Sequence, residues 1–121
     1  MLPVPIRTIL RIEGAVIGGF AILIYFSVLG MSWQSALLFA LLILAPDLSM
    51  LGYLRGPKVG AHAYNAAHTL TVPILLFLTG MLTEQLWAVP LSFIWAAHIG
   101  IDRALGFGLK DVSAFKRTHL N

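Results

Sequence analysis

The chain has 121 residues, of which 59% are hydrophobic and only 11% are charged. A soluble domain carries about 25% charged residues, and a short chain has a large surface for its volume, so a soluble monomer is effectively excluded. The absence of cysteine excludes disulfides, thiolate metal sites, iron–sulfur clusters and cysteine nucleophiles. The length leaves room for one domain, residues 1–121.

Four apolar stretches are long enough to cross a hydrocarbon core of about 30 Å, which takes about 20 helical residues. The connecting segments are short, so consecutive helices are expected to run antiparallel. The sequence therefore predicts an all-α, multi-pass membrane protein, an antiparallel bundle of four transmembrane helices. The expected helices are residues 5–30, 33–53 (interrupted at Pro46), 61–82 and 85–107, followed by a short tail, 110–121.

All eight lysines and arginines fall on one side of these spans: before or within the start of the first, between the second and third, and at or after the end of the fourth. The opposite side carries Glu84 as its charged residue. The positive-inside rule then places both termini and the middle loop in the cytoplasm. We therefore expect an inner (cytoplasmic) membrane protein whose partner is the lipid bilayer and not nucleic acid.

Strongly polar residues within the spans are costly, and all of them fall in the predicted cytoplasmic half. His98 and Asp102 are four residues apart and share a helix face. Pro46 weakens the helical ladder and is expected to leave a free carbonyl near the site. One polar group from every helix at one depth predicts a single site in the bundle core. Its members are Glu13, Asp47, Tyr64, Asn65, His68, His98, Asp102 and Arg103.

Simpler interpretations of these residues stay open. Glu13 could be an interfacial residue paired with Arg11 or with a basic residue of the fourth helix. Asp47 could pair with Arg103, and His68 could be an ordinary buried histidine with its hydrogen bonds satisfied. His98 and Asp102 could likewise form only a structural hydrogen-bonded pair.

Histidine and carboxylate ligands without cysteine suit Zn, Mn or Fe(II). The expected ligands are Asp47, His68, His98 and Asp102, with Glu13 as a further ligand or as the base that takes a proton from metal-bound water. Arg103 would neutralise a phosphate or another anion. Haem bound between His68 and His98 is disfavoured, because carboxylates lie beside both rings.

The favoured hypothesis is a metal-dependent membrane enzyme that acts on a lipid or amphipathic substrate. Three alternatives stay open: His98 as a metal-free general acid or base, a transporter or proton-relay subunit, and a structural protein in which the cluster is a buried polar lock. Small residues of the first helix, Gly14, Gly18 and Gly19, offer a face for a homo-oligomer. The expected catalytic residues are Glu13, Asp47, His68, His98 and Asp102, and the expected substrate-binding residues are Tyr53, Tyr64, Asn65, Arg103 and His119.

Five strings cover nearly the whole chain and resemble an uncharacterised bacterial family of small four-helix membrane proteins, known only as a domain of unknown function. The resemblance implies the architecture and almost no biochemistry. If its last string is a family feature, the tail folds back and brings His119 to the cytoplasmic mouth; the alternative is a disordered terminus. The strings are Pro46–Tyr53 (PDLSMLGY), Tyr64–Thr69 (YNAAHT), His98–Arg103 (HIGIDR), Gly106–Lys110 (GFGLK) and Thr118–Leu120 (THL).

A second, partial resemblance is to the membrane-bound metal-dependent hydrolases. Pro46-Asp47 at a helix end, His68-Thr69 at the next span and the later His98 and Asp102 are similar in kind to the pattern of those enzymes. Two positions depart from it, since Ser49 stands where a second aspartate is expected and Tyr64 where an extra histidine is expected. The resemblance implies a metal ion and hydrolytic chemistry.

Overall fold

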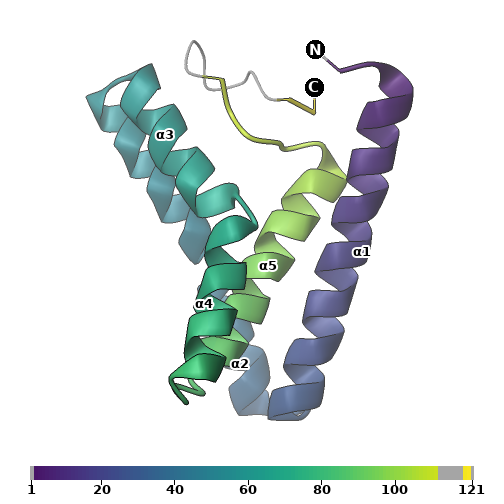
Figure 1. Cartoon of the computed structure of the whole chain (residues 1–121), viewed down its shortest axis with the longest axis vertical. Coiled ribbons are helices and arrows are strands. Elements are labelled where there is room, and N and C mark those ends of the chain that lie inside the picture. Colours follow the sequence, from purple (N-terminus) through teal and green to yellow (C-terminus); the bar gives the residue numbers. More distant parts are fainter. Residues whose placement is uncertain (1, 112–118, 121) are drawn as a thin grey trace.

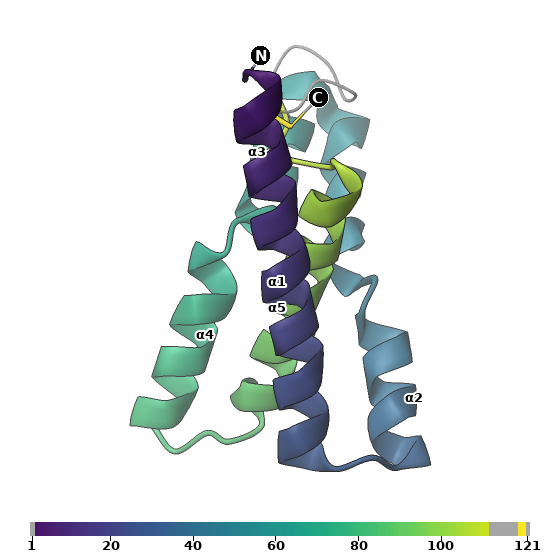
Figure 2. The ribbon, with the colours of Figure 1, turned by 90° about the vertical axis from the view of Figure 1, so that its right-hand side faces the viewer.

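The computed structural model describes residues 2–111 and 119–120. Within these residues the chain is helical and contains no strand. Figures 1 and 2 show α1 and α5 running side by side, and the two ends of the described chain lie at the same end of the molecule. The elements are α1 (Val4–Leu29), α2 (Trp33–Leu42), the 3₁₀ helix η1 (Ala45–Arg55), α3 (Pro57–His68), α4 (Thr71–Leu82) and α5 (Ala88–Leu105).

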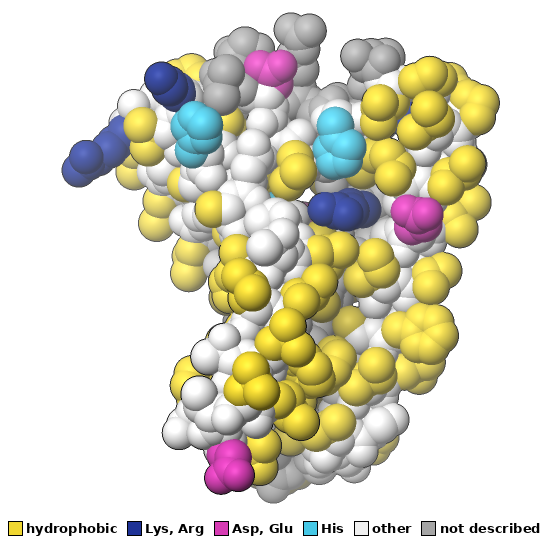
Figure 3. Space-filling model, in the orientation of Figure 1, with side chains coloured by type: hydrophobic (Ala, Val, Ile, Leu, Met, Phe, Trp, Pro, Cys, Tyr) yellow, Lys and Arg dark blue, Asp and Glu magenta, His cyan; other side chains and the backbone are white. Residues whose placement is uncertain are grey.

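Two helical segments are long and apolar enough to cross a membrane, α1 and the continuous stretch Trp33–Arg55 formed by α2 and η1. The pair α3 and α4 forms a third candidate span that is bent by 45°. Large hydrophobic side chains such as Leu23, Leu41 and Leu78 are exposed on the surface. Figure 3 shows hydrophobic side chains over most of one face, with basic and histidine side chains near its upper end. The chain is therefore a membrane-associated helical protein.

The second expected helix is broken next to Pro46. Proline has no N–H and its ring clashes with the carbonyl four residues earlier, so α2 ends at Leu42 and the chain continues as the tighter η1. In η1 the Asp47 N–H donates to the carbonyl of Leu44, 3.0 Å away, instead of to that of Ile43. The Ile43 carbonyl is thereby released from the ladder, and the expectation of a free carbonyl here is confirmed.

The expected helix 61–82 is two helices in the structure, and the reason is again a proline. Pro73 cannot donate to the carbonyl of Thr69, so α3 stops at His68 and Thr69 takes an extended conformation with ψ 138°. The Thr71 N–H turns to the Thr69 hydroxyl, 3.5 Å away, and leaves the Ala67 carbonyl without its helical donor. Each break thus leaves one carbonyl without a helical donor, that of Ile43 at the first and that of Ala67 at the second.

Close contact between α1 and α5 rests on glycine. A Cβ added to Gly100 would lie 2.4 Å from the backbone nitrogen of Gly18, and one added to Gly14 would lie 2.6 Å from Cβ of Arg103. Gly14 and Gly18 are buried against α5 of the same chain, whereas Gly19 is exposed, and the homo-oligomer stays a prediction. The contact between α1 and α5 fixes the position of α5, which carries two residues of the site.

Candidate metal centre

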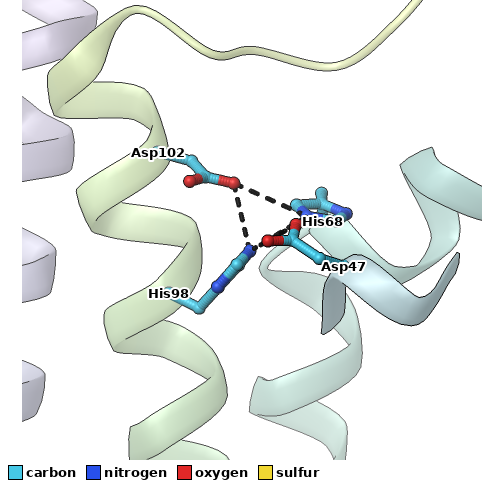
Figure 4. A group of neighbouring side chains, drawn as sticks. All are labelled: Asp47, His68, His98 and Asp102. Atoms are coloured by element: carbon cyan, nitrogen blue, oxygen red, sulfur yellow. Dashed lines mark hydrogen bonds and ion pairs between the residues drawn. The ribbon is translucent and has the colours of Figure 1, made fainter. Parts of the chain in front are cut away.

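Four titratable side chains meet where the two broken helices approach α5 (Figure 4). Asp47 comes from η1, His68 from the last turn of α3, and His98 and Asp102 from successive turns of α5. Each offers one ligand atom, and these four atoms lie within 4.8 Å of one another. We call these four residues the metal centre.

The contacts inside the metal centre are short and nearly equal. The two histidine Nε2 atoms are 3.1 Å apart. Oδ1 of Asp47 lies 3.2 Å from Nε2 of His68 and 3.2 Å from that of His98. Oδ2 of Asp102 lies 3.5 Å from Nε2 of His68 and 3.1 Å from that of His98.

The other ring nitrogen of each histidine faces a main-chain carbonyl. Nδ1 of His98 lies 2.5 Å from the carbonyl oxygen of Ile43, and Nδ1 of His68 lies 2.8 Å from that of Tyr64. A carbonyl oxygen only accepts, so both Nδ1 atoms carry the hydrogen. In the neutral rings the Nε2 atoms therefore present lone pairs to each other and to the two carboxylates.

Four acceptor atoms around one point require either extra protons or a cation between them. With metal–ligand bonds of about 2.0–2.1 Å, tetrahedral angles separate the ligand atoms by roughly 3.3–3.4 Å. The five distances given above, 3.1–3.5 Å, fit that separation. Hydrogen-bonded Nδ1 atoms that orient the rings are also the usual outer shell of metal-bound histidine.

The metal centre is closed on one side and open on the other. The side chains of both histidines are 4% exposed, whereas those of Asp47 and Asp102 are 31% and 19% exposed. The sequence alternative of an Asp47–Arg103 pair is not observed, since the ion pairs of the described residues link Asp47 and Asp102 to the two histidines. Access for water or a ligand is therefore from the carboxylate side.

Tyr64 and Asn65 support the metal centre from α3. The Tyr64 ring is buried and stacks on the His68 ring with centroids 3.7 Å apart. The Asn65 amide forms two hydrogen bonds with the main chain of Lys110: its Nδ2 donates to the carbonyl, 2.8 Å, and its Oδ1 accepts from the N–H, 2.6 Å. The loop after α5 is thereby fastened to α3.

Lys110 and Trp95 are two neighbours that the sequence analysis missed. Nζ of Lys110 lies 4.6 Å from the centroid of the Tyr64 ring. Burial lowers the pKa of Lys110, while the Asp102 and Asp47 carboxylates act in the opposite direction. Nε1 of Trp95 donates to the freed carbonyl of Ala67, 2.6 Å away. Trp95 lies three residues before His98 on the same helix, and Lys110 ends the Gly106–Lys110 string, but neither position alone indicates a place beside the metal centre.

His119 lies beside the loop after α5. Its Nδ1 accepts from the Leu109 N–H, 2.9 Å away, and its own N–H donates to the Leu109 carbonyl. Burial and the Arg103 charge lower the pKa of His119. Three other tail positions lie outside the described residues: Thr118 of the last family string, and Lys116 and Arg117, two of the eight basic residues.

Besides Tyr64, Asn65 and His119, three more expected site residues lie outside the metal centre. Glu13 is exposed on α1, so the structure does not bring its carboxylate into the group. Arg103 is half-buried and its Cβ faces Gly14 of α1. The Tyr53 ring packs over Gly60 of α3, where an added Cβ would lie 2.2 Å from the ring.

These features define a membrane-associated helical protein with a buried His/Asp group that could hold a metal ion. The chain belongs to the DUF4260 family, a domain of unknown function, whose model matches residues 7–121. No curated protein and no solved structure gives a significant match. The resemblance to an uncharacterised family is thus confirmed, whereas the resemblance to hydrolases is not shown by these matches.

Proposed function

We propose that this protein is a metal-dependent membrane enzyme, hydrolase-like in its chemistry, that acts on a lipid or amphipathic substrate. Asp47, His68, His98 and Asp102 would bind one divalent cation, Zn, Mn or Fe(II). A bound cation of this kind lowers the pKa of its water ligand toward about 7 and so supplies a nucleophile at neutral pH.

The orientation of the two imidazole rings is the observation that carries this proposal. Hydrogen bonds from Nδ1 to Ile43 and Tyr64 turn both Nε2 lone pairs inward, toward two carboxylate oxygens. If these four side chains served only to hold the helices together by hydrogen bonds, donors would be expected to face acceptors. An inward set of acceptors, held by main-chain carbonyls, is instead what a cation requires.

Coordination number decides whether such a cation could act on a substrate. Four protein ligands complete a tetrahedral ion, as in structural zinc sites, and leave no place for water. An ion that takes five or six ligands, such as Mn or Fe(II), keeps open positions. The exposed carboxylate side, at Asp47 and Asp102, is where water and substrate would enter.

Cationic side chains near the metal centre would suit an anionic head group. Two aspartates neutralise a divalent cation, so a phosphate or carboxylate on the substrate needs further positive charge. The buried Lys110 and the half-buried Arg103 are candidates for that role. Tyr64 and Asn65 would position Lys110 and the loop that bears it, while Tyr53 and His119 stay candidate substrate contacts.

We also propose a four-span arrangement in the inner membrane, with both termini in the cytoplasm and α5 as the fourth span. The support is the distribution of basic residues in the sequence and the position of both described chain ends at one end of the molecule. Accessibility of single cysteines to a membrane-impermeant reagent in intact cells would test it. Cysteines near Arg55 should be protected, and one near Glu84 should react.

Metal analysis of protein purified without chelators tests the metal centre. We expect one divalent ion per chain, and its loss in Asp47→Asn, His68→Ala, His98→Ala and Asp102→Asn. The matched control is His62→Ala, because His62 lies on the same helix as His68 and is exposed. Folded protein without stoichiometric metal, after supply of Zn, Mn and Fe(II), would contradict the proposal and favour the metal-free polar lock.

Hydrolysis should be assayed separately, with the metal-loaded and the chelated protein in mixed micelles. Single-chain phosphate esters and carboxylic esters would serve as probes, with release of phosphate or free acid as the signal. Activity that follows the metal and is lost in Asp102→Asn, but not in His62→Ala, would support the enzyme. Stoichiometric metal without hydrolysis of any probe would leave a structural metal site.

The two broken spans favour a second candidate, an ion or proton carrier subunit. Discontinuous membrane helices that meet at a polar site are typical of transporters. Here the α2–η1 break and the α3–α4 break meet at Asp47 and His68. Ion or proton flux into liposomes that is lost in Asp47→Asn would favour this candidate over the enzyme.

A further inference from the structure

An apolar cavity of about 400 Å³ lies directly beside the metal centre, between η1, α4 and α5. Its size lies within the range of about 300–1,000 Å³ that is usual for small-molecule sites. On three elements the cavity wall adjoins a metal-centre residue: Pro46 precedes Asp47, Ala67 precedes His68, and Ile94 lies one turn before His98. The four residues of the metal centre do not themselves line the cavity, but a long molecule that fills it would lie close to them.

The wall offers almost nothing for a ligand to hydrogen-bond. Its two polar side chains are Ser49 and Trp95. The Ser49 hydroxyl donates to the Pro46 carbonyl, 2.7 Å away, and the Trp95 N–H donates to the Ala67 carbonyl, 2.6 Å away. Because both donors are already used within the protein, a polar molecule in the cavity would lose its hydrogen bonds to water without replacement.

We propose that this cavity holds a hydrocarbon chain of the substrate, so that the substrate is an amphiphile with its polar head group at the metal centre. This inference rests on the proposed function for the role of the head group, whereas the binding of the chain follows from the cavity alone. Part of its wall belongs to the candidate spans Trp33–Arg55 and α3–α4, which would face bilayer lipid, and the rest to α5. A substrate chain would enter from that lipid.

Fluorescence of Trp95 can report on the cavity. Trp33 and Trp87 are 71% and 61% exposed, so Trp33→Phe and Trp87→Phe should leave the fold intact and Trp95 as the sole tryptophan. Stearic acid brominated in mid-chain quenches indole on contact and is added to the protein in micelles. We expect saturable quenching that unbrominated stearic acid reverses and inorganic phosphate does not.

Filling the cavity should weaken this binding. Leu91→Phe and Ala45→Phe add bulk at two different walls, and we expect the half-saturating concentration to rise about tenfold or more. The control, Leu75→Phe, adds the same ring to an exposed position on α4 outside the cavity wall, and should leave the titration unchanged. Two filling variants keep the test valid if one fails to fold.

The metal content of each variant separates this inference from the proposed function. Leu91→Phe should keep its metal, and Asp47→Asn should lose metal while retaining saturable quenching. Saturable quenching in a protein that never binds metal would retain the chain site and reject the metal enzyme. Quenching that rises linearly with the probe, and equally in Leu91→Phe, Ala45→Phe and Leu75→Phe, would overturn the chain site.

Discussion

Nδ1 of His98 donates a hydrogen bond to the carbonyl of Ile43, 55 positions earlier in the chain. That carbonyl is available because Pro46 lacks an N–H and the helix restarts as η1. A break in the candidate span Trp33–Arg55 thereby orients the ring of a histidine on α5. At the break between α3 and α4, the Trp95 N–H of α5 likewise donates to a freed carbonyl, that of Ala67.

Restoring a continuous helix across the α2–η1 break should therefore weaken metal binding. In Pro46→Ala an α-helical ladder becomes possible, and the Asp47 N–H can compete with His98 for the Ile43 carbonyl. Loss of an outer-shell hydrogen bond of this kind lowers metal affinity by about 10–100-fold. Competition with a chelator of known affinity measures the change. An unchanged affinity would show that the carbonyl does not orient the ring.

The contact between α1 and α5 should not tolerate a side chain at Gly100. In Gly100→Ala the new Cβ would meet the backbone of Gly18 at 2.4 Å, so the two helices must separate. We expect a loss of about 1–3 kcal/mol in the free energy of unfolding. Titration with denaturant in micelles checks this. Gly19→Ala is the control, because its Cβ would meet no atom within 4 Å.

Asn65 should hold down the loop that carries Lys110. Asn65→Leu removes both hydrogen bonds and leaves the Lys110 N–H and carbonyl without their side-chain partner, at a cost of about 1–3 kcal/mol for each buried group. Asn65→Asp keeps the acceptor for the N–H and should have a smaller effect. Faster acetylation of Lys110 in Asn65→Leu than in Asn65→Asp, read by mass spectrometry, is the expected order. Equal rates in all three proteins would count against this role.

His119 should make the same loop sensitive to acid. The pKa of His119 is lowered in the folded protein, so the unfolded chain binds more protons below the ordinary value of about 6.5. The contribution of the neutral ring is complete above that value and is lost as the pH falls through the lowered pKa. Protonation of Nδ1 also abolishes its acceptance from the Leu109 N–H.

Hydrogen exchange checks this expectation. The Leu109 amide, corrected for the intrinsic pH dependence of exchange, should be protected above the ordinary histidine value of about 6.5 and should lose protection well below it. His119→Ala should show low protection above and below this value. Protection that falls equally with pH in His119→Ala would assign the effect to another group.

The sequence predicted the lipid bilayer as the solvent and the four residues of the metal centre as neighbours. The first follows from the low share of charged residues, and the second from the position of each polar residue along its predicted span. Charge scarcity indicated the bilayer, and the polar groups at one depth included all four members of the centre. The break at Pro46 was expected, whereas the break at Thr69 was missed because Pro73 lies within a strongly apolar run. Pro73 has no N–H to donate to the Thr69 carbonyl, and this missing hydrogen bond is the local signal for the break.

Long-range packing could not be predicted from the sequence. Glu13 sits at the expected depth, but the face it occupies on α1 depends on the contact of Gly14 and Gly18 with α5. Lys110 lies over the Tyr64 ring, next to the metal centre, and Asn65 holds its main chain there. Such contacts join segments far apart in sequence, and no local pattern encodes them.

The four residues of the metal centre come from η1, α3 and α5, so they lie after the α2–η1 break and on both sides of the α3–α4 break. A bound ion would therefore act as a cross-link that closes two loops, from Asp47 to His68 and from His68 to His98. Closing such loops removes freedom from the unfolded chain, and a ligand that binds only the folded state raises its stability in proportion to the logarithm of its concentration. In a chain without cysteine, the ion would do what a disulfide does elsewhere, and its removal would loosen the junction of the broken helices before it unfolds α1 and α5.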